Sequence, residues 1–263
     1  MDNRPIGVMD SGLGGLSVLR VLHKRLPKES LLFVGDQGHF PYGTKSQGEL
    51  QHLVLNIGNF LVAHNIKLMI VACNTATGAA LPLLQGKLPV PVIGVIEPGA
   101  VAAIAHHPQT VGVIGTESTI KKGAYDRTLH RLAPKIKVYS HAAQPLVSIV
   151  EHGQTGTSAA QTAVNTELAY FTNHPVQVLV LGCTHFPFLA PEIQHKLGKD
   201  VLLVDPAFET IKQTIRLLTQ KGLLAGQNQG TVRLYTTGRR TDLVAGAQKW
   251  LAGHFTSCEH VDL

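Results

Sequence analysis

This sequence has little of several residue types on which large classes of protein depend. Of its 263 residues, only 3 are cysteine, 5% are aromatic and 15% are charged. Three cysteines cannot all pair with one another, which argues against a secreted fold held by disulfides and favours free thiols in a reducing compartment. No apolar run approaches the roughly 20 residues that span a bilayer, and no apolar leader with a cleavage site follows the first residues. We therefore expect a cytoplasmic protein without a membrane segment.

The positive charge of the chain is modest and dispersed. The formal net charge is +6 and the isoelectric point about 9.3, which suits an anionic ligand or a nucleic acid. Lysine and arginine form no dense run, and few aromatic side chains could stack on bases, so nucleic acid is not the expected partner. None of the 14 histidines stands at a recognised zinc spacing, and we predict no metal site.

Short apolar runs alternate with helical patterns along the chain, which is typical of a parallel α/β fold. The predicted strands cover residues 6–9, 31–34, 68–71, 92–95, 111–114, 178–181, 201–204 and 232–235. Apolar residues at helical spacing predict one helix over 50–61, which Ser46 and Glu49 begin as a capping box. The same spacing over 243–251 predicts a helix that closes the chain. Cys258 lies beyond it in a polar tail of the kind that is often disordered, and we assign it no role.

A weak internal repeat divides the chain into two related halves. Residues 67–77 resemble 177–187, residues 6–15 resemble 111–120, and residues 92–100 resemble 201–209. The repeat predicts a cysteine, Cys73 or Cys183, at the carboxyl end of a strand in each half. Ligands bind outside those strand ends, so two facing halves would enclose one cleft with a thiol on each wall. Chance similarity between generic apolar strands is the alternative.

The two cysteines suggest proton transfer. A single cysteine after an apolar strand is often a small buried hydrophobe, but here both are followed by side chains that can bind a polar ligand. These side chains are Asn74, Thr75 and Thr77 after Cys73, and Thr184 and His185 after Cys183. Opposed thiols suit removal of a proton from one face of a carbon and delivery to the other, which inverts a stereocentre. A thiol needs a nearby group to raise its thiolate fraction before it can act as a base.

Asp10 and His185 are candidates for that support. Asp10 could equally cap the helix expected after it, and Glu151 could be catalytic or simply stand at a helix end near Gly153. The glycine-rich segment 12–15 matches neither the dinucleotide nor the phosphate-loop pattern, so no nucleotide is expected. Its backbone N–H groups could instead hold a substrate carboxylate.

At these motifs the sequence resembles the glutamate racemases of the cofactor-independent aspartate/glutamate racemase superfamily. The matching segments cover nearly the whole chain in the expected order, and they are residues 10–12, 41–43, 72–77, 92–99 and 182–187 to Asp205. The Cys-Thr-His form of 183–185 resembles glutamate rather than aspartate racemases. The resemblance implies two α/β domains related by pseudo-two-fold symmetry, one of residues 1–97 plus 208–263 and the other of 98–207, with the active site between them.

The resemblance also implies residue roles. Cys73 and Cys183 would be the acid/base residues, each serving one enantiomer, with Asp10 supporting Cys73, and Glu151 and His185 supporting Cys183. The implied substrate-binding residues are Asp10, Ser11, Pro41, Tyr42, Gly43, Asn74, Thr75, Thr116, Thr119, Thr184 and His185, with Thr116 and Thr119 on the carboxylate side. From the residues alone, 41–43 reads as a turn and the two threonines as helix caps.

The sequence departs from the family pattern at two places. Phe186 stands where the family usually has tyrosine, and Ala143-Gln144-Pro145 replaces a common Ala-Cys-Pro, which loosens the alignment leading to Glu151. The resemblance implies no cofactor, L- and D-glutamate as substrates, and D-glutamate for peptidoglycan synthesis. It leaves open a homodimer and an interaction with DNA gyrase, which some relatives restrain. The alternatives are an aspartate racemase, or a two-lobed amino-acid-binding protein, which would leave the paired thiols unexplained.

Overall fold

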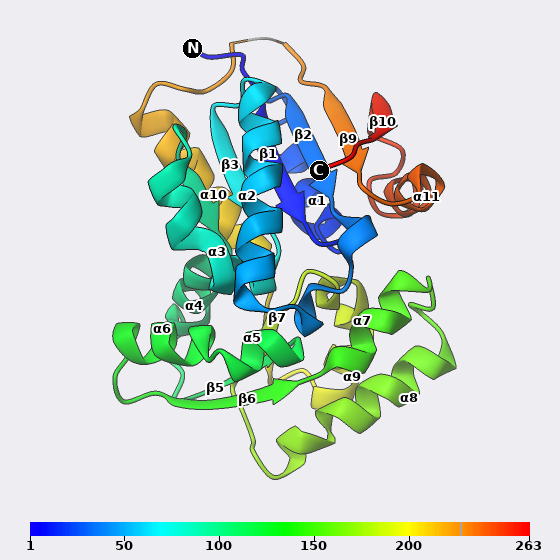
Figure 1. Cartoon of the computed structure of the whole chain (residues 1–263). Coiled ribbons are helices and arrows are strands. Elements are labelled where there is room, and N and C mark those ends of the chain that lie inside the picture. The colour runs from blue at the N-terminus through cyan, green and yellow to red at the C-terminus, as the bar shows by residue number, and fades with distance from the viewer. Residues whose placement is uncertain (227) are drawn as a thin grey trace.

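The fold consists of two parallel β-sheets, each covered by helices, in a computed structural model that describes residues 1–226 and 228–263 (Figure 1). The first sheet has the strand order β10-β9-β2-β1-β3-β4 and the second β6-β5-β7-β8, and every pairing is parallel. The predicted α/β class with two similar parallel-sheet domains is confirmed.

The elements have the following bounds. The strands are β1 Ile6–Asp10, β2 Leu31–Gly35, β3 Leu68–Val71, β4 Val92–Gly94, β5 Thr110–Gly115, β6 Lys137–Ala142, β7 Val178–Gly182, β8 Leu202–Val204, β9 Val232–Thr236 and β10 Ser257–His260. The α-helices are α1 Leu16–Arg25, α2 Gln47–Ala63, α3 Asn74–Lys87, α4 Ile96–Ile104, α5 Glu117–Lys121, α6 Ala124–Leu132, α7 Gln144–Glu151, α8 Ser158–Glu167, α9 Ala190–Leu197, α10 Pro206–Gln220 and α11 Arg240–Trp250. Short 3-10 helices cover Gln37–His39, Tyr42–Thr44, Leu168–Thr172 and Phe186–Leu189.

The internal repeat corresponds to a repeated arrangement of strands. The order β2-β1-β3-β4 in the first sheet is the order β6-β5-β7-β8 in the second. The three pairs of similar segments contain β1 and β5, β3 and β7, and β4 and β8, which occupy equivalent places. The sequence similarity therefore follows the fold rather than chance.

The C-terminal segment returns to the first sheet. Strand β9 pairs with β2, and β10 pairs with β9 at the edge. Helix α10 contacts both α4 and α1, and so bridges the two halves. The domain boundaries after residues 97 and 207 stay predictions.

Two expectations for the end of the chain are wrong. A strand, β10, and not the helix over 240–250 closes the fold, and Cys258 is 8% exposed within it, opposite Leu234. The sequence signal is weak because Ser257–His260 is a short, mostly polar edge strand. Strand β6 was also missed for the same reason, since none of its residues is fully buried.

Helix α2 begins as predicted. Ser46 Oγ accepts a hydrogen bond from the Glu49 backbone N–H, and Glu49 Oε2 accepts one from the Ser46 N–H. Within the described ranges, no helix is both long and apolar enough to cross a bilayer.

Candidate functional site

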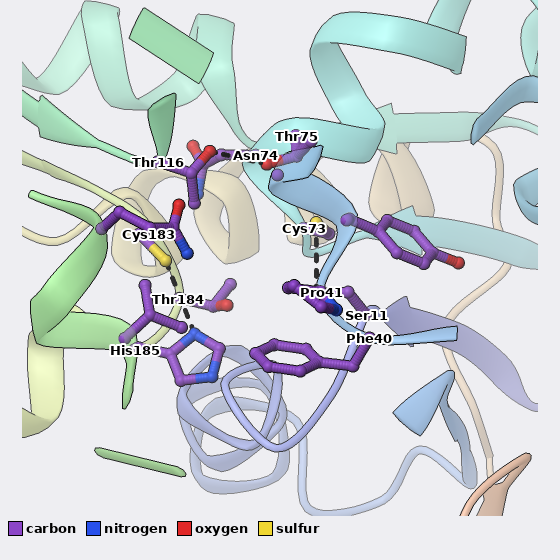
Figure 2. A pocket seen from close by; sticks show the side chains of 14 residues that line it. Ser11, Phe40, Pro41, Cys73, Asn74, Thr75, Thr116, Cys183, Thr184 and His185 are labelled. Carbon is purple, nitrogen blue, oxygen red and sulfur yellow. Dashed lines mark hydrogen bonds between the residues drawn. The ribbon is translucent and has the colours of Figure 1, made fainter. Parts of the chain in front are cut away.

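A small cavity lies between the two halves, near the carboxyl ends of β1, β3 and β7. Figure 2 shows Cys73 and Cys183 on opposite sides of this cavity. The residues that line it are Ser11, Phe40, Pro41, Tyr42, Gly43, Cys73, Asn74, Thr75, Thr116, Gln144, Val147, Cys183, Thr184 and His185.

Cys73 caps a helix from the first half. It follows β3 and is the N-cap of α3, where its sulfur accepts a hydrogen bond from the Ala76 N–H at 3.4 Å. Its thiol also donates to Ser11 Oγ at 3.7 Å. Burial, and then the nearby charge of Asp10, raise the pKa of Cys73 to about 12, so the protonated thiol is its resting form.

Asp10 is fully buried behind the cavity at the end of β1. Its Oδ2 accepts hydrogen bonds from the backbone N–H groups of Gly12, at 3.1 Å, and Gly15, at 3.0 Å. Its Oδ1 accepts one from Thr184 Oγ1 of the other half, at 3.2 Å. Burial raises the pKa of Asp10 to about 6, although the charge of His185 and these hydrogen bonds oppose the rise. Asp10 therefore both caps the turn before α1 and joins the two halves.

The sequence suggests that the N–H groups of the glycine-rich turn after β1 could hold a substrate carboxylate. In the structure, three of these N–H groups already have partners within the protein. Asp10 binds the N–H groups of residues 12 and 15, and Glu151 accepts from the Leu13 N–H at 3.3 Å. A Cβ on Gly14 would stand 2.3 Å from Thr184 Oγ1 and 2.6 Å from His185 Nδ1. This glycine therefore allows the two halves to approach closely beside the second thiol.

Cys183, His185 and Glu151 form a chain of contacts in the second half. Cys183 follows β7, and its sulfur lies 3.5 Å from His185 Nδ1. His185 Nε2 donates to Glu151 Oε1 at 2.6 Å, where α7 ends. Burial alone would lower the pKa of His185, but its interactions with Cys183 and Glu151 raise that pKa well above the usual range. The raised pKa favours the imidazolium form of His185, and a positive charge at this position stabilises negative charge on a neighbouring sulfur.

Three threonines join the halves on another wall of the cavity. Thr75 Oγ1 lies 3.0 Å from Thr116 Oγ1 and 3.2 Å from Thr119 Oγ1, and those two atoms are 2.9 Å apart. Thr116 is also the N-cap of α5, so the same residue both caps this helix and lines the cavity. The cluster places hydroxyl groups from both halves next to Asn74 (Figure 2).

Buried tyrosines hold two of the lining groups. Tyr125 OH donates to Asn74 Oδ1 at 2.8 Å, which fixes the orientation of that amide. Tyr42 OH donates to Asp36 Oδ2 at 2.5 Å, and Asp36 Oδ1 accepts from Thr237 Oγ1 at 2.6 Å. Residues that directly follow β2 and β9 thus hold Tyr42 in the cavity wall through the buried carboxylate of Asp36.

The structure brings together the residues that the sequence analysis proposed, in two layers. Eleven of them line the cavity, whereas Asp10, Glu151 and Thr119 lie behind it and contact lining residues. Thr77 does not line the cavity, because its hydroxyl donates to the Val71 carbonyl at 3.0 Å. Phe40, Gln144 and Val147 also line the cavity and were not predicted. Of these, only Gln144 had a signal, as one of the two departures from the family pattern.

The described ranges, 1–226 and 228–263, contain no group of three His, Cys, Asp or Glu side chains that could hold a metal ion. All three cysteines are free thiols.

Comparison with known proteins gives a consistent picture over the whole chain. The family described as Asp/Glu/Hydantoin racemase matches residues 6–214. A glutamate racemase of Limosilactobacillus reuteri is 62% identical over 263 residues, which is 100% of this chain and 98% of that protein. A glutamate racemase isoform of Bacillus anthracis has a similar structure, with a TM-score of 0.96, 40% identity and coverage of 100% and 99%. The glutamate racemase of Francisella tularensis in complex with D-glutamate has a TM-score of 0.93, with 35% identity and coverage of 100% and 98%.

Proposed function

This chain belongs to the Asp/Glu/Hydantoin racemase family, as its motifs predicted, and we propose that it interconverts L-glutamate and D-glutamate. The observation that carries the proposal is the pair of thiols, Cys73 and Cys183, which line one cavity from equivalent strand ends of the two halves. The chemistry needs a base on one face of Cα and an acid on the other. The relatives that act on glutamate make it the first substrate to test.

In one direction, Cys183 removes the Cα proton. The imidazolium of His185 stabilises negative charge on its sulfur, and Glu151 stabilises that imidazolium. Cys73, which is protonated at rest, then donates its proton to the opposite face of Cα. The product has inverted configuration, with the Cys73 sulfur now negative and the Cys183 thiol protonated.

In the other direction, Cys73 is the base. Its sulfur must lose its proton in a buried place, and the Ala76 N–H and Ser11 hydroxyl are the groups that can stabilise the thiolate. Asp10 has a pKa of about 6, and loses negative charge when it is protonated. Asp10 can take up a proton when Cys73 becomes a thiolate and release it when Cys73 is protonated again, and this exchange is the support that we propose Asp10 gives to Cys73.

The test is circular dichroism of the purified protein with L-glutamate and then D-glutamate, without added cofactor. The wild type should bring either signal to zero, and Cys73→Ala and Cys183→Ala should each abolish the decay. Cys258→Ala is the matched control, because this buried cysteine lies in β10, outside the cavity lining, and should leave the decay unchanged. Decay that survives loss of either cavity thiol would refute the two-thiol mechanism.

Two alternatives have their own outcomes in this assay. Decay with aspartate but not glutamate would identify an aspartate racemase. A binding protein without turnover would show neither decay nor exchange of the Cα hydrogen in D₂O, whereas a racemase incorporates deuterium at Cα.

Our proposal places the enzyme in the cytoplasm, where its D-glutamate would supply peptidoglycan synthesis. A homodimer and an interaction with DNA gyrase stay predictions. Sedimentation at several protein concentrations tests the first. A supercoiling assay with Cys73→Ser tests the second, since inhibition of gyrase that persists without racemisation requires a separate binding role.

A further inference from the structure

The one positively charged side chain among the described lining residues is the imidazolium of His185, and its two ring nitrogens already contact Cys183 and Glu151. Glutamate carries two carboxylates and one ammonium group, and the inference below rests on its being the substrate. Among the described residues, no lysine or arginine lines the cavity. Neutral N–H and O–H groups must therefore bind both carboxylates.

The groups next to the thiols serve the substituents on Cα. Asn74 and Thr75 follow Cys73 at the start of α3, and Thr184 follows Cys183, so these side chains lie beside the reacting carbon when it is between the sulfurs. The distal carboxylate is two methylene groups farther from Cα. It needs a donor on another part of the wall.

Gln144 is a polar side chain of the wall to which the proposed mechanism gives no role. It is the first residue of α7, and its Oε1 is buried without a hydrogen-bond partner among the described residues. The same oxygen lies 3.0 Å from the position that a Cβ on Gly43 would take. The carboxamide therefore lies against the bare backbone of Gly43, within the Pro41–Gly43 wall.

We propose that Gln144 is a specificity-determining residue, whose side-chain amide donates a hydrogen bond to the distal carboxylate of glutamate beside Gly43. Half a turn of the carboxamide exchanges its oxygen and nitrogen with little change in shape. The buried position of Gln144 Oε1 is then occupied by the amide nitrogen, and the distal carboxylate of the substrate accepts a hydrogen bond from its N–H. An unpartnered buried acceptor is destabilising, so substrate binding removes that penalty from the free protein.

The position of Gln144 on α7 suits this role. Pro145 follows it in the first turn and fixes the backbone there, while Glu151 ends the same helix and holds His185. One short helix therefore carries both the group that binds the far end of the substrate and the group that supports the second thiol.

The test compares Gln144→Leu and Gln144→Glu, two replacements of similar size, in the racemisation assay. Loss of a hydrogen bond to a charged group should raise KM for glutamate about tenfold in Gln144→Leu, with kcat changed less than about threefold. Gln144→Glu should raise KM about 100-fold, because two carboxylates then face each other. Gln154→Leu makes the same replacement at an exposed residue in the loop between α7 and α8 and should leave KM unchanged.

L-Glutamine as a competitive inhibitor identifies which end of the substrate is bound, since a neutral amide replaces its distal carboxylate. Its inhibition constant should stay within about twofold of the wild-type value in Gln144→Glu. A glutamine constant that rises in parallel with the glutamate KM would overturn the inference, because the contact would then be with groups on Cα. A glutamate KM within about threefold of wild type in Gln144→Glu would also overturn it. Absence of racemisation by the wild type would instead refute the proposed function.

Discussion

Asp10→Asn should stabilise the fold while impairing catalysis. Asp10 is fully buried, and burial raises its pKa from an ordinary value of 3.8 to about 6. At about 1.36 kcal/mol per pH unit, ionising this carboxyl in the folded protein costs about 3 kcal/mol more than in the unfolded chain. The existing hydrogen bonds suit an amide as well, since its oxygen can accept from Gly12 and Gly15 and its nitrogen can donate to the Thr184 hydroxyl.

The pH dependence follows from the direction of the shift. A raised folded-state pKa means that the native state binds the proton more tightly, so the contribution of Asp10 to stability is fully present below pH 3.8 and is lost as pH rises through about 6. Asparagine does not titrate. The stability advantage of Asp10→Asn should therefore be small near pH 4, grow up to pH 6, and level off at about 3 kcal/mol above it.

Chemical denaturation with urea from pH 4 to pH 8 measures this difference, and thermal unfolding should show a midpoint about 6 to 12 °C higher for Asp10→Asn at pH 8. Asp200→Asn is the matched control, because this aspartate is exposed between α9 and β8. Racemisation by Asp10→Asn should fall, because asparagine cannot take up and release the proton by which we propose that Asp10 supports Cys73. A variant that is equally or less stable than the wild type at pH 8 would refute the reasoning.

Two further predictions concern buried polar contacts. Lys67→Met leaves Glu29 buried without the ammonium group that lies 2.5 Å from it, and should lower the free energy of unfolding in urea by about 3 to 5 kcal/mol. Adding Glu29→Leu should recover part of this loss, and no recovery would contradict the charge argument. Tyr125→Phe removes the donor to Asn74 Oδ1 and should raise KM for glutamate about fivefold in the racemisation assay, as one neutral hydrogen bond predicts. Tyr139→Phe, in β6, is the control and should leave KM unchanged.

The fold was largely predictable because its core is built from a repeated pattern. The central strands are buried on both faces and read as short apolar runs, and β3 begins and ends at the predicted residues. Edge strands do not carry that signal. Strands β6 and β10 are polar and partly exposed, so their pairing depends on neighbouring strands rather than on their own sequence.

The site residues that directly follow strand ends could be predicted from the sequence. Cys73 and Cys183 could be paired because the repeat places them equivalently. Contacts such as Tyr125 with Asn74 and Thr237 with Asp36 join residues far apart in the sequence. Such single polar contacts have no periodic pattern, and only the packing of the two halves reveals them.

The two thiols are equivalent in topology but differ in their surroundings, which has a kinetic consequence. L- and D-glutamate have the same free energy in water, so kcat/KM must be equal in the two directions for the wild type and for every variant. Glu151→Gln removes the charge next to His185 and should lower both values together, by about 10². The difference between the two thiols must therefore appear in a quantity other than kcat/KM, such as the isotope effect on each direction. With glutamate deuterated at Cα, Glu151→Gln should increase the primary isotope effect for the enantiomer that Cys183 deprotonates and decrease it for the other. Asp10→Asn should produce the opposite pair of changes through Cys73, and equal isotope effects for both enantiomers in both variants would contradict the assignment of one supporting group to each thiol.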